Sequence, residues 1–162
     1  MKKTSWIIIL AALLIFLGIF NHAVYKKERL IDQGQPILME LAPVDPRSLI
    51  QGDYMRLDYR LGQEMAQDSL PAKGLCALEI DARGVAKNIR HIQNPGELRA
   101  GELPIKYSKR GWRGMHFGAE SYFFQEGTGE KYEVAKYGGI KVDEKGNCIL
   151  IGLYDENLHK IE

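Results

Sequence analysis

The hydrophobic pattern divides this chain into a continuous apolar stretch near the N-terminus and a longer part in which apolar and polar residues alternate. No charged residue lies in residues 4–25, and the run from Trp6 to Phe20 is apolar throughout. At ~1.5 Å per residue, a helix over this segment reaches roughly 33 Å, enough to cross a bilayer core of about 30 Å. The pattern predicts a transmembrane helix that continues into a polar stalk, together residues 1–32.

Two interpretations of this helix are open, a cleaved signal peptide and an uncleaved signal anchor. Lys2 and Lys3 would form the basic start of a signal peptide, with cleavage near Ala23. Asn21 occupies a position where the cleavage pattern needs a small side chain, and the apolar run is long for a signal peptide. Both observations favour the anchor, which would tether residues 33–162 to a membrane.

The charges that flank the helix decide its orientation only weakly. Lys2 and Lys3 lie on one side, and Lys26, Lys27 and Arg29 lie on the other, so the positive-inside rule is nearly balanced. A very short N-terminal tail followed by a large domain is the usual arrangement of a signal anchor. We therefore expect the domain outside the cytoplasm, with a cytoplasmic domain as the alternative.

The pattern after residue 32 predicts a β-rich α+β domain that is mostly antiparallel and contains a short helix. Residues 74–92 and 139–154 are each expected to form a hairpin, because each contains a turn that starts with Asp and ends with Gly. Asp accepts hydrogen bonds within such a turn, and Gly supplies the positive φ that closes it. Further strands are expected at 36–43, 53–61, within 97–106 and within 115–124, a helical turn at 44–50, and a helix at 128–138 capped by Thr128.

The segment 51–59, QGDYMRLDY, begins as a turn and continues as a strand. Alternation along a strand places successive side chains on opposite faces of the sheet. One face would carry Asp53, Met55, Leu57, Tyr59 and Leu61 into the core, and the other would carry Tyr54, Arg56, Asp58 and Arg60 toward solvent. Gly52 permits a tight turn before the strand, and Asp53 can accept backbone hydrogen bonds there.

Gly52, Asp53, Tyr54, Leu57 and Tyr59 match every specified position of the pattern Gly-Asp-Tyr-x-x-Leu-x-Tyr, so the chain resembles the GDYXXLXY family of bacterial proteins. The resemblance continues through residues 117–127 to the final hairpin. It implies one membrane segment in the bacterial inner membrane, a periplasmic domain, and a multi-spanning membrane protein as partner, because family members are often encoded beside one. It implies no catalytic residues, and the five motif residues are expected to be structural or partner-binding.

A second resemblance concerns residues 45–53, which are similar to the region after the nucleophile of signal-peptidase-like serine proteases. Such enzymes need a serine nucleophile and a lysine base that burial keeps neutral. Pro43 stands where the serine belongs, Ser48 lies too late in the segment, and Lys87 lies in a mixed stretch where exposure is expected. An inactive relative of these proteases is therefore the alternative to an accessory membrane subunit.

Composition and charge add little further chemistry. The net charge of +1 gives no electrostatic reason to expect nucleic acid as a partner. Neither a metal-ligand spacing nor a cofactor motif is present in the sequence, so no metal and no cofactor are expected. Cys76 and Cys148 each lie in an apolar strand-like run, which favours burial as thiols over pairing in an oxidising compartment.

The most basic window of the chain is a candidate contact with anionic lipid or another anion near the membrane. It comprises Lys106, Lys109, Arg110, Trp112 and Arg113. The alternative is a solvated loop, which is the usual position of such charges. A nearby carboxylate, Glu120, precedes an apolar strand and is expected to be partly buried and paired with an arginine such as Arg113.

Overall fold

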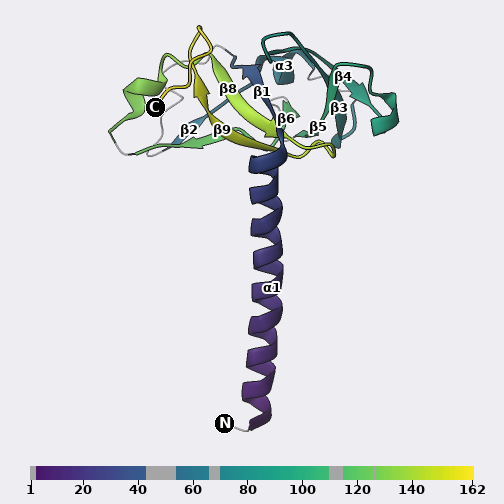
Figure 1. Cartoon of the computed structure of the whole chain (residues 1–162), viewed down its shortest axis with the longest axis vertical. Coiled ribbons are helices and arrows are strands. Elements are labelled where there is room, and N and C mark those ends of the chain that lie inside the picture. The colour runs from purple at the N-terminus through teal and green to yellow at the C-terminus, as the bar shows by residue number, and fades with distance from the viewer. Residues whose placement is uncertain (1–2, 43–53, 66–69, 110–114, 126) are drawn as a thin grey trace.

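A long N-terminal helix carries a β-rich domain at its C-terminal end (Figure 1). The computed structural model describes residues 3–42, 54–65, 70–109, 115–125 and 127–162. Helix α1 runs from Lys3 to Gln33, and its apolar side chains are exposed over the segment in which the sequence predicts a membrane span. Within the described residues, the part from Trp6 to Gln33 is long and apolar enough to cross a membrane. The helix ends at Gln33, where Gly34 N donates to Leu30 O at 3.0 Å.

Within the described residues, the domain contains three sheets. The first has the order β1 (Gln35–Glu40), β8 (Tyr137–Val142) and β9 (Cys148–Tyr154). The second has the order β4 (Ala86–Ile92), β3 (Lys73–Ile80), β5 (Glu102–Lys109) and β6 (Met115–His116). The third is a ribbon of two short strands, β2 (Tyr54–Arg56) and β7 (Ser121–Phe123). Every pairing between these strands is antiparallel, which confirms the expected β-rich α+β class.

Both expected hairpins are confirmed, and their turns share one hydrogen-bond arrangement. Asp81 Oδ1 accepts the N–H groups of Arg83 and Val85, each at 2.9 Å. Asp143 Oδ1 accepts those of Lys145 at 2.9 Å and Asn147 at 2.8 Å. The closing residues Gly84 and Gly146 have φ of 80° and 77°, in the region where only glycine is unstrained.

The helix expected at 128–138 is wrong in extent. Only a 3-10 turn, Gly129–Tyr132, forms there, and the hydroxyl of Thr128 donates to Gln125 O at 2.6 Å instead of capping a helix. Strand β8 already begins at Tyr137, where it pairs with β1 on one side and β9 on the other. Two ladders of backbone hydrogen bonds therefore compete with helix formation in the second half of the segment, and the ladders prevail.

The strand expected at 53–61 is also shorter than the alternation suggests. It ends at Arg56, and a five-residue helix, α3 (Arg60–Glu64), follows Tyr59, which bridges to Leu41. The remaining strands are confirmed with shifted bounds: β1 ends at Glu40, a 3-10 turn at Pro95–Glu97 precedes β5, and residues 115–124 contain β6 and β7 in separate sheets. The helical turn expected at 44–50 lies outside the described residues.

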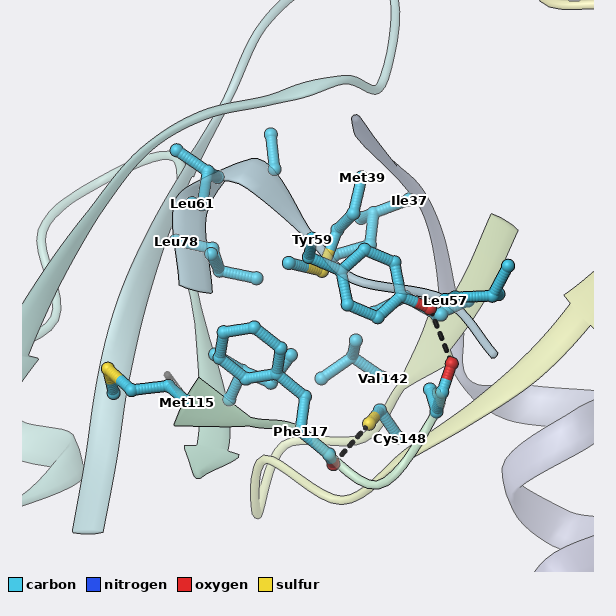
Figure 2. Close-up of a cluster of buried hydrophobic side chains, with 14 of the residues drawn as sticks. Ile37, Met39, Leu57, Tyr59, Leu61, Leu78, Met115, Phe117, Val142 and Cys148 are labelled. Atoms are coloured by element: carbon cyan, nitrogen blue, oxygen red, sulfur yellow. Dashed lines mark hydrogen bonds between the residues drawn. The ribbon is translucent and has the colours of Figure 1, made fainter. Parts of the chain in front are cut away.

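One hydrophobic core joins these sheets (Figure 2). Its fully buried members come from strands, from helix α3 and from the segment before it, among them Ile37, Met39, Leu57, Leu61, Leu78, Ile105, Ile140 and Leu153. At roughly 25 cal/mol per Å² of apolar surface removed from water, this burial is the main favourable contribution to folding. The core also decides which side chains of the motif are available to a partner.

Candidate functional site

The described residues of the Gly-Asp-Tyr motif divide between the core and the surface. Gly52 and Asp53 lie outside the described residues. Leu57 and Tyr59 are 1% and 3% exposed, whereas Tyr54 is 38% exposed. Met55 and Leu61 are also buried, so the predicted core face is confirmed for the described residues even though the strand ends early.

Tyr59 anchors the motif through its hydroxyl group. The Tyr59 hydroxyl donates to Ala119 O at 2.5 Å, and its ring meets that of Phe117 edge-on, with centroids 6.0 Å apart (Figure 2). Burial raises the pKa of Tyr59 well above its usual value, and the negative charge of Glu120 raises it further. The phenol therefore keeps its proton and remains a hydrogen-bond donor. A Cβ on Gly138 would lie 2.9 Å from the Tyr59 ring, so this glycine of β8 makes room for it.

Glu120 organises the loop that supplies the acceptor for Tyr59. Its carboxylate accepts the N–H groups of Phe117 and Gly118, and its own carbonyl accepts Leu57 N at 2.8 Å. Glu120 is partly buried, as expected. Arg113, the partner suggested by the sequence, lies outside the described residues, and the bonds seen here come from the backbone. The Glu120 carboxylate thus stabilises the turn at residues 117–120, and carbonyl groups of that turn accept hydrogen bonds from Leu57 and Tyr59 of the motif.

Both cysteines are buried free thiols, which confirms the expected burial. Cys148 Sγ donates to Phe117 O at 3.0 Å (Figure 2). Burial raises the pKa of Cys76 to about 12, and burial followed by the charge of Glu120 raises that of Cys148 to about 12. Thiolate is the reactive form of cysteine, so neither side chain is a nucleophile at neutral pH.

The ribbon of β2 and β7 presents two aromatic side chains to solvent. Tyr54 pairs with Phe123 across the ribbon, and their ring centroids lie 5.8 Å apart. Phe123 is 74% exposed, the most exposed large apolar side chain among the described residues. We call Tyr54 and Phe123 the aromatic face. Tyr122, the neighbour of Phe123 in β7, turns the other way and packs on Tyr132.

The structure separates the residues of the basic window that it describes. Lys106 Nζ donates to Asn147 Oδ1 at 2.9 Å in the β8–β9 turn, whereas Lys109 Nζ donates to Leu70 O at 3.2 Å. Arg110, Trp112 and Arg113 lie outside the described residues. Lys106 is therefore placed beside a turn that the sequence did not connect with it.

The described part of the candidate protease machinery does not provide a buried base. Lys87 is exposed and lies 3.5 Å from the carboxylate of Asp81 in an ion pair. A charged, solvated lysine of this kind is not the neutral amine that such an enzyme needs. Ser48 and Pro43 lie outside the described residues. Within those residues, no group of three or more His, Cys, Asp or Glu side chains is placed to hold a metal ion.

The junction between α1 and the domain is packed and hydrogen-bonded. Leu30 is buried, and Lys141 Nζ of β8 donates to Ile31 O near the end of the helix. A groove with a volume of about 430 Å³ lies beside this contact, between the last turns of α1 and the β8–β9 turn. The helix is therefore fixed to the domain instead of being joined to it by a free linker.

These features define a β-domain protein on a long apolar helix, with Leu57 and Tyr59 of its sequence motif built into the core. Comparison with protein-family models identifies the family: the chain matches the GDYXXLXY protein family over residues 16–153, and it belongs to this family. A search of curated proteins found no match, and a search of solved structures also found none.

Proposed function

We propose that this protein is a membrane-anchored accessory subunit whose domain contacts a multi-spanning membrane protein. Residues 1–32 act as an uncleaved anchor and stalk, and residues 33–162 form a domain on the periplasmic side of a bacterial inner membrane. The observation that carries this proposal is the continuity of the apolar helix with the domain. The buried side chain of Leu30 and the bond from Lys141 to Ile31 O fix the helix to the domain. Such a junction would hold the domain in a defined position beside a membrane partner.

The aromatic face is the surface we assign to that contact. Aromatic side chains are enriched at protein interfaces because they bury a large area at little cost in side-chain entropy. Strand β2, which carries Tyr54, lies on the side of the domain that faces the helix (Figure 1). A partner embedded in the same membrane would reach this side first. The motif then has two tasks: Leu57 and Tyr59 build the core, and Tyr54 is displayed from it.

Site-specific photo-crosslinking in cells tests this assignment. A photoreactive amino acid is placed at Tyr54 or Phe123, and matched controls are placed at the exposed positions Glu156 and Asn157 of the last turn. We expect adducts with one multi-spanning membrane protein, identified by mass spectrometry, from Tyr54 and Phe123 only. Equal adducts from all four positions, or adducts with soluble proteins alone, would contradict the accessory function.

A further inference from the structure

The groove at the junction of α1 and the domain is lined by charged side chains from two separate elements. Lys26 and Arg29 come from α1, and Asp143, Glu144 and Lys145 come from the β8–β9 turn. The turn lies at the helix-facing edge of the domain, beside the end of α1 (Figure 1). Residues 119 positions apart in sequence, Lys26 and Lys145, therefore line one groove.

The three cations of the groove lack carboxylate partners within the described part of the chain. Among the residues that the structure describes, no ion pair joins Lys26, Arg29 or Lys145 to an acidic side chain. Arg29 Nε donates to Gln33 Oε1 at 2.9 Å, which uses one of the five N–H donors of its guanidinium group. Cations held close together repel one another, and an anion bound between them would relieve that repulsion.

The groove lining carries two carboxylates against three cations, so its charged side chains sum to +1. The Asp143 carboxylate points into the turn. It accepts hydrogen bonds from Lys145 N, Asn147 N and the side-chain amide of Asn147 at 2.9, 2.8 and 2.7 Å. Glu144 is the second carboxylate of the lining, and among the described residues it forms no ion pair with the three cations. Lys106 adds a fourth positive charge on the other side of the turn, through its bond to Asn147.

Helix geometry places the groove at the level of lipid headgroups. If residues 4–25 span the hydrocarbon core, Lys26 is the first residue beyond it. Arg29 lies roughly 4.5 Å further along the axis at ~1.5 Å per residue. The headgroup layer is about 5–7 Å thick on each side of the core. Both helix cations fall within this layer, and the turn holds Lys145 beside them.

We propose that this groove binds the phosphate of an anionic phospholipid headgroup. The inference rests on the membrane anchor of the proposed function and adds a specific ligand to it. Arg29 can offer paired N–H donors to phosphate oxygens, and Lys26 and Lys145 supply point charges on either side. Such a lipid would contact both α1 and the β8–β9 turn. It would add a third link between helix and domain to those made by Leu30 and Lys141.

Native mass spectrometry of the full-length chain in detergent micelles measures this binding. Phosphatidylglycerol is the anionic probe, and phosphatidylcholine is the zwitterionic comparison. The variant K26Q/R29Q/K145Q removes the three groove cations. The matched control K73Q/K131Q/K136Q removes three cations from elsewhere on the domain. Each basic residue near an anionic lipid contributes about fivefold in affinity, so the groove variant is expected to lose on the order of 100-fold.

The proposal is supported if the wild type and the control variant prefer phosphatidylglycerol and the groove variant does not. It is overturned if the groove variant binds like the control, or if both lipids bind the wild type equally. Displacement of the lipid by inorganic phosphate at equal concentration would assign the groove to free phosphate and overturn the lipid source. The same spectrum reports the mass of the chain: loss of the N-terminal segment contradicts the anchor, whereas an intact chain without lipid contradicts the groove alone.

Discussion

Two tyrosines of one short motif have opposite roles, and their hydrogen bonds and exposure explain why. Tyr59 is buried and donates to Ala119 O, whereas Tyr54 is partly exposed beside Phe123. A buried carbonyl that loses its donor must bear the cost of desolvation without compensation. The two hydroxyl groups therefore differ in their contribution to stability, although they belong to the same residue type and lie five positions apart.

We predict that Tyr59→Phe lowers the free energy of unfolding by about 1–3 kcal/mol, because Ala119 O is left buried without its donor. Tyr54→Phe is the matched control and should change it by less than about 0.5 kcal/mol, as is usual at exposed positions. Urea unfolding of the full-length chain in detergent, followed by circular dichroism, measures both. Equal values for the two variants would show that the Tyr59 bond does not stabilise the core.

At the scale of elements, the two Asp-x-x-Gly hairpins are alike in hydrogen bonding and different in surroundings. A Cβ on Gly84 would meet nothing within 4 Å. A Cβ on Gly146 would lie 2.9 Å from Leu75 Cδ1 and 3.1 Å from Lys106 N, whose N–H donates to Gly146 O. The β8–β9 turn is thus packed onto β5, while the β3–β4 turn is free on that side.

Gly84→Ala should destabilise the domain by roughly 1–2 kcal/mol, the cost of holding an L-residue at positive φ. Gly146→Ala has the same backbone cost. Its Cβ would also crowd backbone and side-chain atoms, and overpacking of this kind typically costs about 1–3 kcal/mol more. The difference between the two midpoints of thermal unfolding isolates the packing contribution. If the two variants unfold together, the close approach to β5 carries no energetic weight.

An ion pair between Arg90 of β4 and Glu102 of β5 stabilises the segment that connects these two strands. Arg90 donates through Nε and Nη2 to the two carboxylate oxygens of Glu102, at 3.0 and 2.6 Å. Its Nη2 also donates to Glu97 O at 2.6 Å. The hydrogen bonds from Arg90, followed by that from Arg99 N, lower the pKa of Glu102 from 4.5 to about 2. The side chain of Glu102 is 10% exposed, so the pair is shielded from much of the solvent.

This shift sets a window of pH for its effect on stability. Because the pKa of Glu102 is lower in the folded chain than in the unfolded chain, its contribution is complete above pH 4.5 and is lost as the pH falls toward 2. We expect Glu102→Gln to be less stable than the wild type at pH 7 and to lose less stability across that acid range. Glu79→Gln, on the exposed end of β3, serves as the control. If the stability of the wild type and of Glu102→Gln fell in parallel with pH, the acid sensitivity would not come from the lowered pKa of Glu102.

At the scale of the whole molecule, helix α1 and the domain are packed against each other. Leu30 is buried at this junction, and the bond from Lys141 to Ile31 O joins α1 to the sheet that β1, β8 and β9 build. The charges on the two sides of the helix leave its orientation nearly balanced. Retention of the helix and the side on which the domain lies therefore need separate measurements.

We predict that the protein recovered from membranes has the mass of the full chain and resists extraction at alkaline pH, because residues 4–25 are long enough to span the bilayer core. A C-terminal alkaline phosphatase fusion should be active, since that enzyme matures only outside the cytoplasm. A mature chain that begins near Val24, just after the candidate cleavage site, would contradict the anchor. An intact but inactive fusion would instead place the domain in the cytoplasm.

Features with a local or periodic cause were predictable from the sequence. The apolar helix, the two hairpins and the burial of Leu57, Tyr59 and both cysteines depend on composition, alternation and turn chemistry within a few residues. The same reasoning failed at 128–138 and after Arg56. There, pairing with β1 and β9, and the packing around Tyr59, overrode local preference.

The amino-acid sequence by itself therefore determined the kind of protein this is: a long apolar helix followed by antiparallel strands, with the motif side chains divided between core and surface. Only the tertiary structure decided which residues meet, because those contacts join positions tens of residues apart. It paired Tyr59 with Ala119, brought Lys106 and Lys145 to one turn, and set that turn beside Lys26 and Arg29. No period or spacing in a single sequence records such distances, since the free energy that selects them is that of the whole packed core.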